Sequence, residues 1–167
     1  MSDLAGKSII VTGAAGSIGH ATACVLAEQG ADLLLVDTDG ERLVERSAAV
    51  AAFGTRIENF RADVSHAEQV RAYVARAQRA FGRIDGLFNN AGTEGRIASI
   101  ESYDEGEFDR IIATNLRSIF LGLRHVMPVM LEQGSGSIVN TGSIASERGL
   151  AGACAYNASK QDRKSVV

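Results

Sequence analysis

Short runs of aliphatic residues alternate along this chain with longer amphipathic stretches. We expect strands where the aliphatic runs occur, at residues 8–12, 32–36, 56–61, 84–89 and 137–141. The stretches between them carry apolar residues at helical spacing, as Val70, Tyr73 and Val74 do, and several end at a glycine. Strands that alternate with helices are typical of crossover units, which build parallel sheets covered on both faces. The sequence therefore predicts an α/β fold.

The composition allows one domain with a sizeable core. The chain has 167 residues, 46% of them hydrophobic, and a net charge of −3 with scattered basic residues. This charge pattern does not indicate nucleic-acid binding, and no apolar run is long enough to span a membrane. The N-terminus lacks the layout of a signal peptide, and Cys24 and Cys154 form no metal-binding pattern. We expect a cytoplasmic protein without a metal site.

A glycine-rich turn, Thr12-Gly13-Ala-Ala-Gly16-Ser17-Ile18-Gly19, follows the first predicted strand and precedes a predicted helix. This order suits a pyrophosphate group, because glycines allow close approach of the backbone and a helix N-terminus offers N–H groups. An ordinary turn between a strand and a helix would show the same pattern. The turn alone is therefore a modest indication of a dinucleotide site.

Two acidic positions support a nucleotide site. Asp37 ends the second predicted strand, where a carboxylate can accept hydrogen bonds from both ribose hydroxyls of NAD and would repel the 2′-phosphate of NADP. No Lys or Arg occupies the glycine turn or residues 38–41, so we expect NAD. Asp63 and Val64 are candidates for contacts with adenine. Each position also has a purely structural explanation. Asp37 could belong to a turn, and Asp63 and Val64 could belong to a polar loop before a helix capped by Ser65.

Tyr156 and Lys160 are four residues apart and therefore share one face of a helix. A phenol ordinarily ionises near pH 10, about 3 units above neutrality. An ammonium group about 4 Å away favours the ionised form by roughly 4 kcal/mol at an effective dielectric constant of about 20, which covers that gap. Lys160 can therefore make Tyr156 a usable acid and base, although a surface Tyr–Lys pair would show the same spacing.

Ser143 lies thirteen residues before Tyr156, just past the fifth predicted strand. Ligands of open α/β sheets bind beyond the carboxyl ends of strands, so its hydroxyl could hold a substrate carbonyl oxygen. A serine of an ordinary loop is the alternative. Asn115 lies in the middle of a long predicted helix, where asparagine is mildly unfavourable, and it is either a satisfied polar residue or a functional one.

In this order, the motifs resemble the short-chain dehydrogenase/reductase family, in its single-domain branch, over residues 6–160. The resemblance implies a Rossmann-like, doubly wound parallel sheet of about five strands in the order 3-2-1-4-5, with the late strands of the family missing. The cofactor-binding residues that it implies are Gly13, Ser17, Ile18, Gly19, Asp37, Asp63, Val64, Asn90, Ala91, Gly92, Tyr156 and Lys160. The catalytic residues that it implies are Asn115, Ser143, Tyr156 and Lys160.

The resemblance also implies a role for each catalytic residue. Tyr156 would be the acid and base, and Lys160 would bind the nicotinamide ribose and make the tyrosine more acidic. Ser143 would orient the substrate, and Asn115 would hold a water of the proton relay. The parent protein would be an NAD-dependent oxidoreductase that transfers hydride between nicotinamide and a secondary alcohol or ketone. It would be a homodimer or homotetramer.

This sequence departs from the family pattern in two respects. The spacing TGxxGxxG, with Ser17 where the single-domain branch has glycine, resembles a branch with many epimerases and dehydratases. An NAD-using epimerase or dehydratase is therefore an alternative, as is a non-catalytic dinucleotide-binding module. Family members also continue past the Tyr156 helix, so we expect residues 1–161 to be a truncated NAD-binding domain with impaired turnover. We expect residues 162–167 to be a non-native tail, since one reverse translation of them resembles a sequencing adapter.

Overall fold

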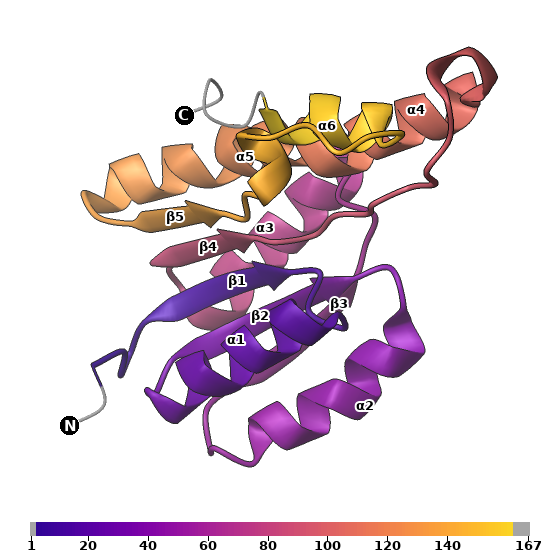
Figure 1. The fold of residues 1–167 in the computed structure, drawn as a ribbon. Coiled ribbons are helices and arrows are strands. Elements are labelled where there is room, and N and C mark those ends of the chain that lie inside the picture. Colours follow the sequence, from indigo (N-terminus) through magenta and orange to yellow (C-terminus); the bar gives the residue numbers. More distant parts are fainter. Residues whose placement is uncertain (1–2, 162–167) are drawn as a thin grey trace.

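The computed structural model describes residues 3–161, so the predicted non-native tail at residues 162–167 lies outside the described residues. Five parallel strands form one sheet in the order β3-β2-β1-β4-β5 (Figure 1). The strands are β1 (Ser8–Thr12), β2 (Asp32–Asp37), β3 (Ile57–Arg61), β4 (Gly86–Asn89) and β5 (Ser137–Asn140). The predicted α/β fold and its strand order are confirmed.

Helices cover the sheet on both faces. They are α1 (Ser17–Glu28), α2 (Gly40–Ala51), α3 (Ala67–Phe81), α4 (Glu105–Ile112), α5 (Ser118–Gln133) and α6 (Cys154–Gln161). Helices α1 and α2 pack on one face, and α3 and α5 pack on the other. Helix α6 packs against α4, on the β4–β5 side of the molecule (Figure 1).

Successive residues of β2 enter two different cores. Leu33 and Leu35 pack with residues of α1 and α2, whereas Leu34 and Val36 pack with residues of α3 and α5. All four side chains are buried, and burial of an aliphatic side chain of this size contributes about 1.5–3 kcal/mol. Because side chains alternate along a strand and both faces are covered, the four buried middle positions of this central strand are all apolar.

The long helix predicted around Asn115 is interrupted. Helix α4 ends at Ile112, a π-helical turn η2 (Ala113–Arg117) follows, and α5 begins at Ser118. Single π-helical turns inside helices occur frequently at functional sites. Two short 3-10 turns complete the described chain, η1 (Ile100–Ser102) and η3 (Ile144–Ser146).

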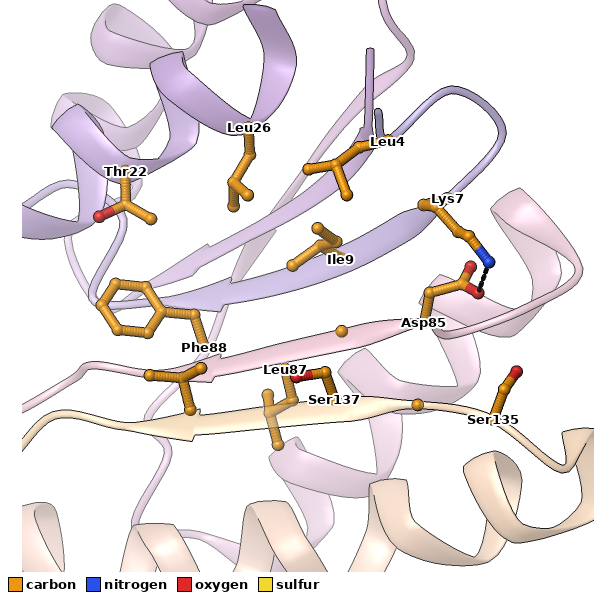
Figure 2. Close-up of a pocket in the computed structure, with 13 residues that line it drawn as sticks. Leu4, Lys7, Ile9, Thr22, Leu26, Asp85, Leu87, Phe88, Ser135 and Ser137 are labelled. Carbon is orange, nitrogen blue, oxygen red and sulfur yellow. Dashed lines mark hydrogen bonds and ion pairs between the residues drawn. The ribbon is translucent and has the colours of Figure 1, made fainter. Parts of the chain in front are cut away.

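An apolar groove of about 470 Å³ lies on the α1 side of the sheet, over β1, β4 and β5 (Figure 2). Leu26 of α1 and Ile9 of β1 contribute to its walls, and an ion pair between Lys7 and Asp85 closes one end (Figure 2). That end lies where β1 and β4 begin. Ligands of open α/β sheets bind at the opposite, carboxyl ends of the strands, which is where the candidate residues lie.

Asp85 joins the start of β4 to the start of β1. Its carboxylate accepts hydrogen bonds from the Ser8 N–H at 3.0 Å, from Lys7 Nζ at 3.2 Å and from Arg83 Nε at 2.6 Å. Burial opposes the ionisation of Asp85, but the hydrogen bonds from Arg83, Ser8 and Lys7 outweigh it and lower its pKa to about 2. The ionised carboxylate therefore stabilises the folded state.

We predict that Asp85→Asn lowers the free energy of unfolding by about 1 kcal/mol at neutral pH, a value reduced because Arg83 and Lys7 are partly exposed. Since the folded-state pKa is depressed, the stabilisation is fully present above about pH 4 and is lost as the pH falls through about 2. Urea denaturation between neutral and acid pH measures this difference. The exposed Asp109→Asn is the control, and a difference that stayed constant with pH would contradict the prediction.

Candidate active site

The glycine turn lies between β1 and α1, at the carboxyl edge of the sheet. Gly13 has a φ of 66°, and a Cβ atom there would lie 2.9 Å from the Cα of Ala91. Gly19, buried in α1, packs so closely on the Gly13 carbonyl group that it has no space for a side chain. These two glycines bring the N-terminus of α1, with its unpaired N–H groups, close to the segment after β4.

Two adjoining cavities of about 430 and 320 Å³ follow this edge of the sheet, and both are lined by Gly13, Asp37, Ala91 and Gly92. The first cavity is also lined by Ala15, Gly16, Ser17, Ile18, Asp39, Arg42 and Asn90. The second is also lined by Thr38, Ala62, Asp63, Val64, Thr93, Arg110 and Thr114. We call the two cavities together the cofactor cleft, because most of the predicted cofactor-binding residues line them. Three of the predicted cofactor-binding residues, Gly19, Tyr156 and Lys160, do not line the cleft. Gly19 lies beneath the glycine turn.

Asp37 connects the glycine turn to the loop before α2. Its Oδ2 atom accepts a hydrogen bond from the Ala15 N–H at 2.9 Å, and its Oδ1 atom accepts one from the Asp39 N–H at 3.1 Å. A carboxylate has about four acceptor positions, so two hydrogen bonds leave capacity for ligand hydroxyl groups. Its position in the cleft is thus set by backbone groups on both sides.

Asp63 is held at the end of the cleft by Ser65 and His66. Its Oδ1 atom accepts hydrogen bonds from Ser65 N–H at 2.9 Å and Ser65 Oγ at 2.7 Å, and His66 Nδ1 lies 3.3 Å from its Oδ2 atom. Burial opposes the charge on Asp63, but the Ser65 hydrogen bonds and the nearby His66 outweigh it and lower its pKa. The predicted Ser65 cap of α3 is wrong, because the hydroxyl bonds Asp63 and the N-cap residue is His66.

Asn90 joins the carboxyl ends of three neighbouring strands. Thr12 Oγ1, at the end of β1, accepts hydrogen bonds from the N–H groups of Asn90 at 3.0 Å and Ala91 at 3.2 Å. Asn90 Nδ2 donates to the Thr12 carbonyl at 3.1 Å, and Thr141 Oγ1, just past β5, donates to Asn90 Oδ1 at 3.2 Å. The side chain of Asn90 therefore anchors the segment that carries Ala91 and Gly92.

Lys160 connects the cofactor cleft to helix α6. Its side chain is 4% exposed, and its Nζ atom donates to the Thr141 carbonyl at 3.4 Å. That Nζ atom lies 5.4 Å from the ring centroid of the half-buried Tyr156, and 3.7 Å from the point where a Cβ atom of Gly92 would lie. The cation is thus close both to the tyrosine ring and to the cleft lining.

Asn115 lies in the π-helical turn η2 and is completely buried. Its Oδ1 atom accepts a hydrogen bond from the Thr93 N–H at 2.8 Å, and its Nδ2 atom donates to the Thr93 carbonyl at 2.8 Å and to Ser159 Oγ at 2.9 Å. Ser159 Oγ donates in turn to the Tyr156 carbonyl at 2.8 Å. The amide of Asn115 therefore ties the segment after β4 to the helix that carries Tyr156 and Lys160.

Ser143 begins the 3-10 turn η3, in the loop after β5. Its hydroxyl oxygen accepts a hydrogen bond from the Ala145 N–H at 3.2 Å. The Ser143 N–H donates to Ser146 Oγ at 3.3 Å, and Ser146 Oγ donates to the Lys160 carbonyl at 3.0 Å. Ser146 therefore links the loop of Ser143 to the end of α6.

The structure reveals residues that the sequence patterns did not indicate. Ser146 and Ser159 support the loop and helix of the predicted catalytic residues, and Arg42 lines the cofactor cleft. Ser159 had one weak signal, which is its place between Tyr156 and Lys160 on a helix that buries one face. Ser146 and Arg42 had no such signal in the sequence patterns.

Within residues 3–161, no group of three or more His, Cys, Asp or Glu side chains is arranged to hold a metal ion. None of the helices in this part of the chain combines the length and the hydropathy that crossing a membrane requires.

A family model described as short chain dehydrogenase matches residues 7–165 of this chain. The levodione reductase of Leifsonia aquatica is 46% identical over 156 residues, which cover 92% of this chain and 58% of that protein. The 3β-hydroxysteroid dehydrogenase 2 of Eggerthella lenta is 34% identical over 158 residues, which cover 94% of this chain and 61% of that protein.

Solved structures match over a similar range. The crystal structure of levodione reductase has a TM-score of 0.92 and 43% identity, and the match covers 95% of this chain and 62% of that one. NAD⁺-bound xylitol dehydrogenase has a TM-score of 0.93 and 39% identity, and the match covers 95% of this chain and 61% of that one. A short chain dehydrogenase/reductase from Burkholderia phymatum in complex with NAD has a TM-score of 0.94 and 33% identity, with 99% and 59% covered. This chain spans about three fifths of the length of these relatives.

We predict that Gly13→Ala lowers the free energy of unfolding more than Gly54→Ala does. Both glycines have a left-handed φ, 66° and 82°, so both substitutions carry a backbone cost of roughly 1–2 kcal/mol. A Cβ atom at position 13 also meets the backbone of Ala91, whereas position 54 has no atom within 4 Å, so we expect an additional loss of about 1–3 kcal/mol at position 13. Urea denaturation followed by circular dichroism measures both losses, and equal losses would contradict the prediction.

Proposed function

Because the chain belongs to the short chain dehydrogenase family, we propose that the protein is an NAD-dependent oxidoreductase that interconverts a secondary alcohol and a ketone. The observation that carries this proposal is the position of Lys160. Its ammonium group lies beside both the Tyr156 ring and the backbone of Gly92 in the cofactor cleft. One residue therefore connects a proton-transfer group to the place that a cofactor would occupy.

The residues of the cofactor cleft fit a dinucleotide. The glycine turn and the N-terminus of α1 offer backbone N–H groups to a pyrophosphate, and Asp37 offers acceptors to ribose hydroxyls. Val64 is among the residues that line the second cavity, where an adenine ring would contact it. Bound NAD supplies a hydride acceptor or donor at its nicotinamide ring. The NAD-bound relatives support this choice of cofactor.

Tyr156 would give a proton to the oxygen of a ketone, or take one from an alcohol. Lys160 is buried beside the Tyr156 ring and would hold the substrate-facing tyrosine next to the cofactor. Positioned proton transfer of this kind contributes about 10²–10⁴ in rate. Lys160 would also bind a ribose hydroxyl of the cofactor, since its Nζ atom lies beside the cleft.

Ser143 and Asn115 would assist Tyr156 and Lys160 in the reaction. Ser143 would hold the substrate oxygen, because it lies just past the carboxyl end of β5. Asn115 would hold a water of the proton relay, and its side chain keeps α6 beside the segment after β4 through Ser159. The network of Asn115, Ser159 and Ser146 thus orients α6 from two sides.

The names of the relatives support an alcohol or ketone substrate. They are a reductase of levodione and dehydrogenases of a 3β-hydroxysteroid and of xylitol. The glycine spacing with Ser17 favours a second hypothesis, in which an epimerase or dehydratase keeps NAD bound through a complete catalytic cycle. The two hypotheses differ in whether free NAD is consumed.

We predict that Tyr156→Phe lowers kcat by about 10²–10⁴ and changes the Kd for NAD by less than about threefold, because the phenol hydroxyl transfers a proton and contributes little to cofactor binding. Isothermal titration of the chain measures NAD binding. The absorbance of NADH, with a panel of secondary alcohols, measures turnover by the chain and by any longer protein that contains it. Tyr73→Phe, in the core between the sheet and α3, is the matched control.

Three outcomes would count against this function. Equal turnover by wild type and Tyr156→Phe would exclude Tyr156 as the acid and base. Binding of NAD without turnover in the longer protein would favour a non-catalytic module. Conversion of substrate without net change in free NAD would favour an epimerase or dehydratase.

A further inference from the structure

The hydroxyl group of Ser146 is bonded to two segments of the proposed active site. Its Oγ atom accepts a hydrogen bond from the Ser143 N–H at 3.3 Å and donates one to the Lys160 carbonyl at 3.0 Å. Ser143 would hold the substrate oxygen, and Lys160 carries the cation that lies beside the Tyr156 ring. A single side chain therefore connects the loop after β5 to helix α6.

The same bond determines where the Ser143 hydroxyl lies. Ser143 and Ser146 form a reciprocal capping box around η3, in which the side chain of each bonds the backbone of the other. The Ser143 hydroxyl oxygen also accepts a hydrogen bond from the Ala145 N–H at 3.2 Å. Since a hydroxyl group has one donor besides its acceptor positions, these bonds leave the Ser143 O–H group for a substrate oxygen. Ser146 fixes the backbone from which that O–H group extends.

The loop between Ser143 and Tyr156 has a second attachment to α6. The Asn157 side chain accepts a hydrogen bond from the Leu150 N–H at 3.0 Å and donates one to the Leu150 carbonyl at 2.8 Å. Loss of the Ser146 hydroxyl would therefore leave the loop attached at Leu150 and would release mainly the turn that carries Ser143. Because Ser146 is small and half-buried, its replacement by alanine removes one oxygen atom and opens little empty space.

Proton transfer between a tyrosine and a substrate oxygen depends strongly on geometry. Well-oriented reacting atoms lie about 3–3.5 Å apart, and a displacement of about 1 Å can lower a rate by about 100-fold. The hydroxyl of Ser143 would set the place of the substrate oxygen, whereas α6 sets the place of the Tyr156 hydroxyl. A hydrogen bond between these two segments therefore affects whether both hydroxyl groups reach the same oxygen.

We propose that Ser146 is a positioning residue, which sets the place of the Ser143 hydroxyl relative to Tyr156. Ser146 does not line the cofactor cleft, and it acts through the Ser143 N–H and the Lys160 carbonyl. This inference rests on the proposed function, because it assigns to Ser146 a part in the same reaction.

The test is a double-mutant cycle of wild type, Ser143→Ala, Ser146→Ala and the double variant. The absorbance of NADH, with the panel of secondary alcohols, gives kcat and KM for the chain and for any longer protein that contains it. We expect Ser146→Ala to lower kcat by about tenfold with a smaller change in KM, because the displaced Ser143 hydroxyl stabilises the developing charge less well. In the Ser143→Ala background, Ser146→Ala should lower kcat by less than about threefold, since its effect passes through Ser143.

Three further measurements accompany the cycle. Ser146→Thr keeps a hydroxyl group and should retain most of the wild-type kcat. Ser135→Ala, at an exposed position before β5, should leave kcat and KM unchanged. Hydrogen exchange of the Ser143 N–H, followed by NMR, does not depend on turnover, and Ser146→Ala should accelerate it by about tenfold. Ser146→Gly also lacks the hydroxyl and replaces Ser146→Ala if circular dichroism shows that this variant does not fold.

The outcomes separate this inference from the proposed function. If Tyr156→Phe loses turnover while Ser146→Ala keeps the wild-type kcat, the inference fails and the proposed function stands. If the losses from Ser143→Ala and Ser146→Ala multiply in the double variant, Ser146 does not act through Ser143, and the inference fails. If Ser146→Thr folds and is as slow as Ser146→Ala, the hydroxyl is not the positioning group. If Tyr156→Phe turns over as fast as wild type, the proposed function fails and this inference fails with it.

Discussion

The hydrogen bonds of Thr12 hold the carboxyl ends of β1 and β4 together, and the candidate site is built on this junction. The Thr12 hydroxyl accepts from two successive N–H groups, those of Asn90 and Ala91, so the chain after β4 turns directly over Gly13. Only a residue without a side chain fits beneath it. Because Gly92 follows in the same segment, the junction also places the cleft lining beside Lys160.

Helix α6 depends on a buried polar network rather than on its own stability. Its described part, Cys154–Gln161, has eight residues, and an isolated helical segment of that length is marginal in water. Asn115 and Ser146, from two different segments, bond to it through Ser159 and through the Lys160 carbonyl. Buried polar groups are costly unless they are paired, so the hydrogen-bonded network of Asn115, Ser159 and Ser146 favours one orientation of Tyr156 and Lys160.

Hydrogen bonds also fix the charged carboxylate of Asp37 in the cleft. Backbone N–H groups on both sides hold the Asp37 carboxylate, while Arg42 is fixed by its backbone and keeps an exposed side chain. A fixed carboxylate discriminates between ligands more sharply than a mobile one, because it cannot move away from a like charge. In the proposed function, selectivity for NAD over NADP would therefore depend on Asp37 at the end of β2 rather than on the glycine turn.

Local patterns in the sequence indicated the α/β class and most of the residues that line the two cavities, and the family resemblance indicated the parallel strand order. Aliphatic periodicity, a glycine turn and an acidic residue after a strand are local patterns, and parallel strands bring their carboxyl ends to one edge. The sequence did not determine the π-helical turn at Asn115, the bond between Ser65 and Asp63 that replaces the expected cap, or the placement of Ser146, Ser159 and Arg42. The contacts of Asn115, Ser146 and Ser159 were decided by the tertiary structure, because a hydrogen bond such as that of Asn115 to Ser159 joins residues 44 positions apart, and no local pattern specifies which distant groups will meet.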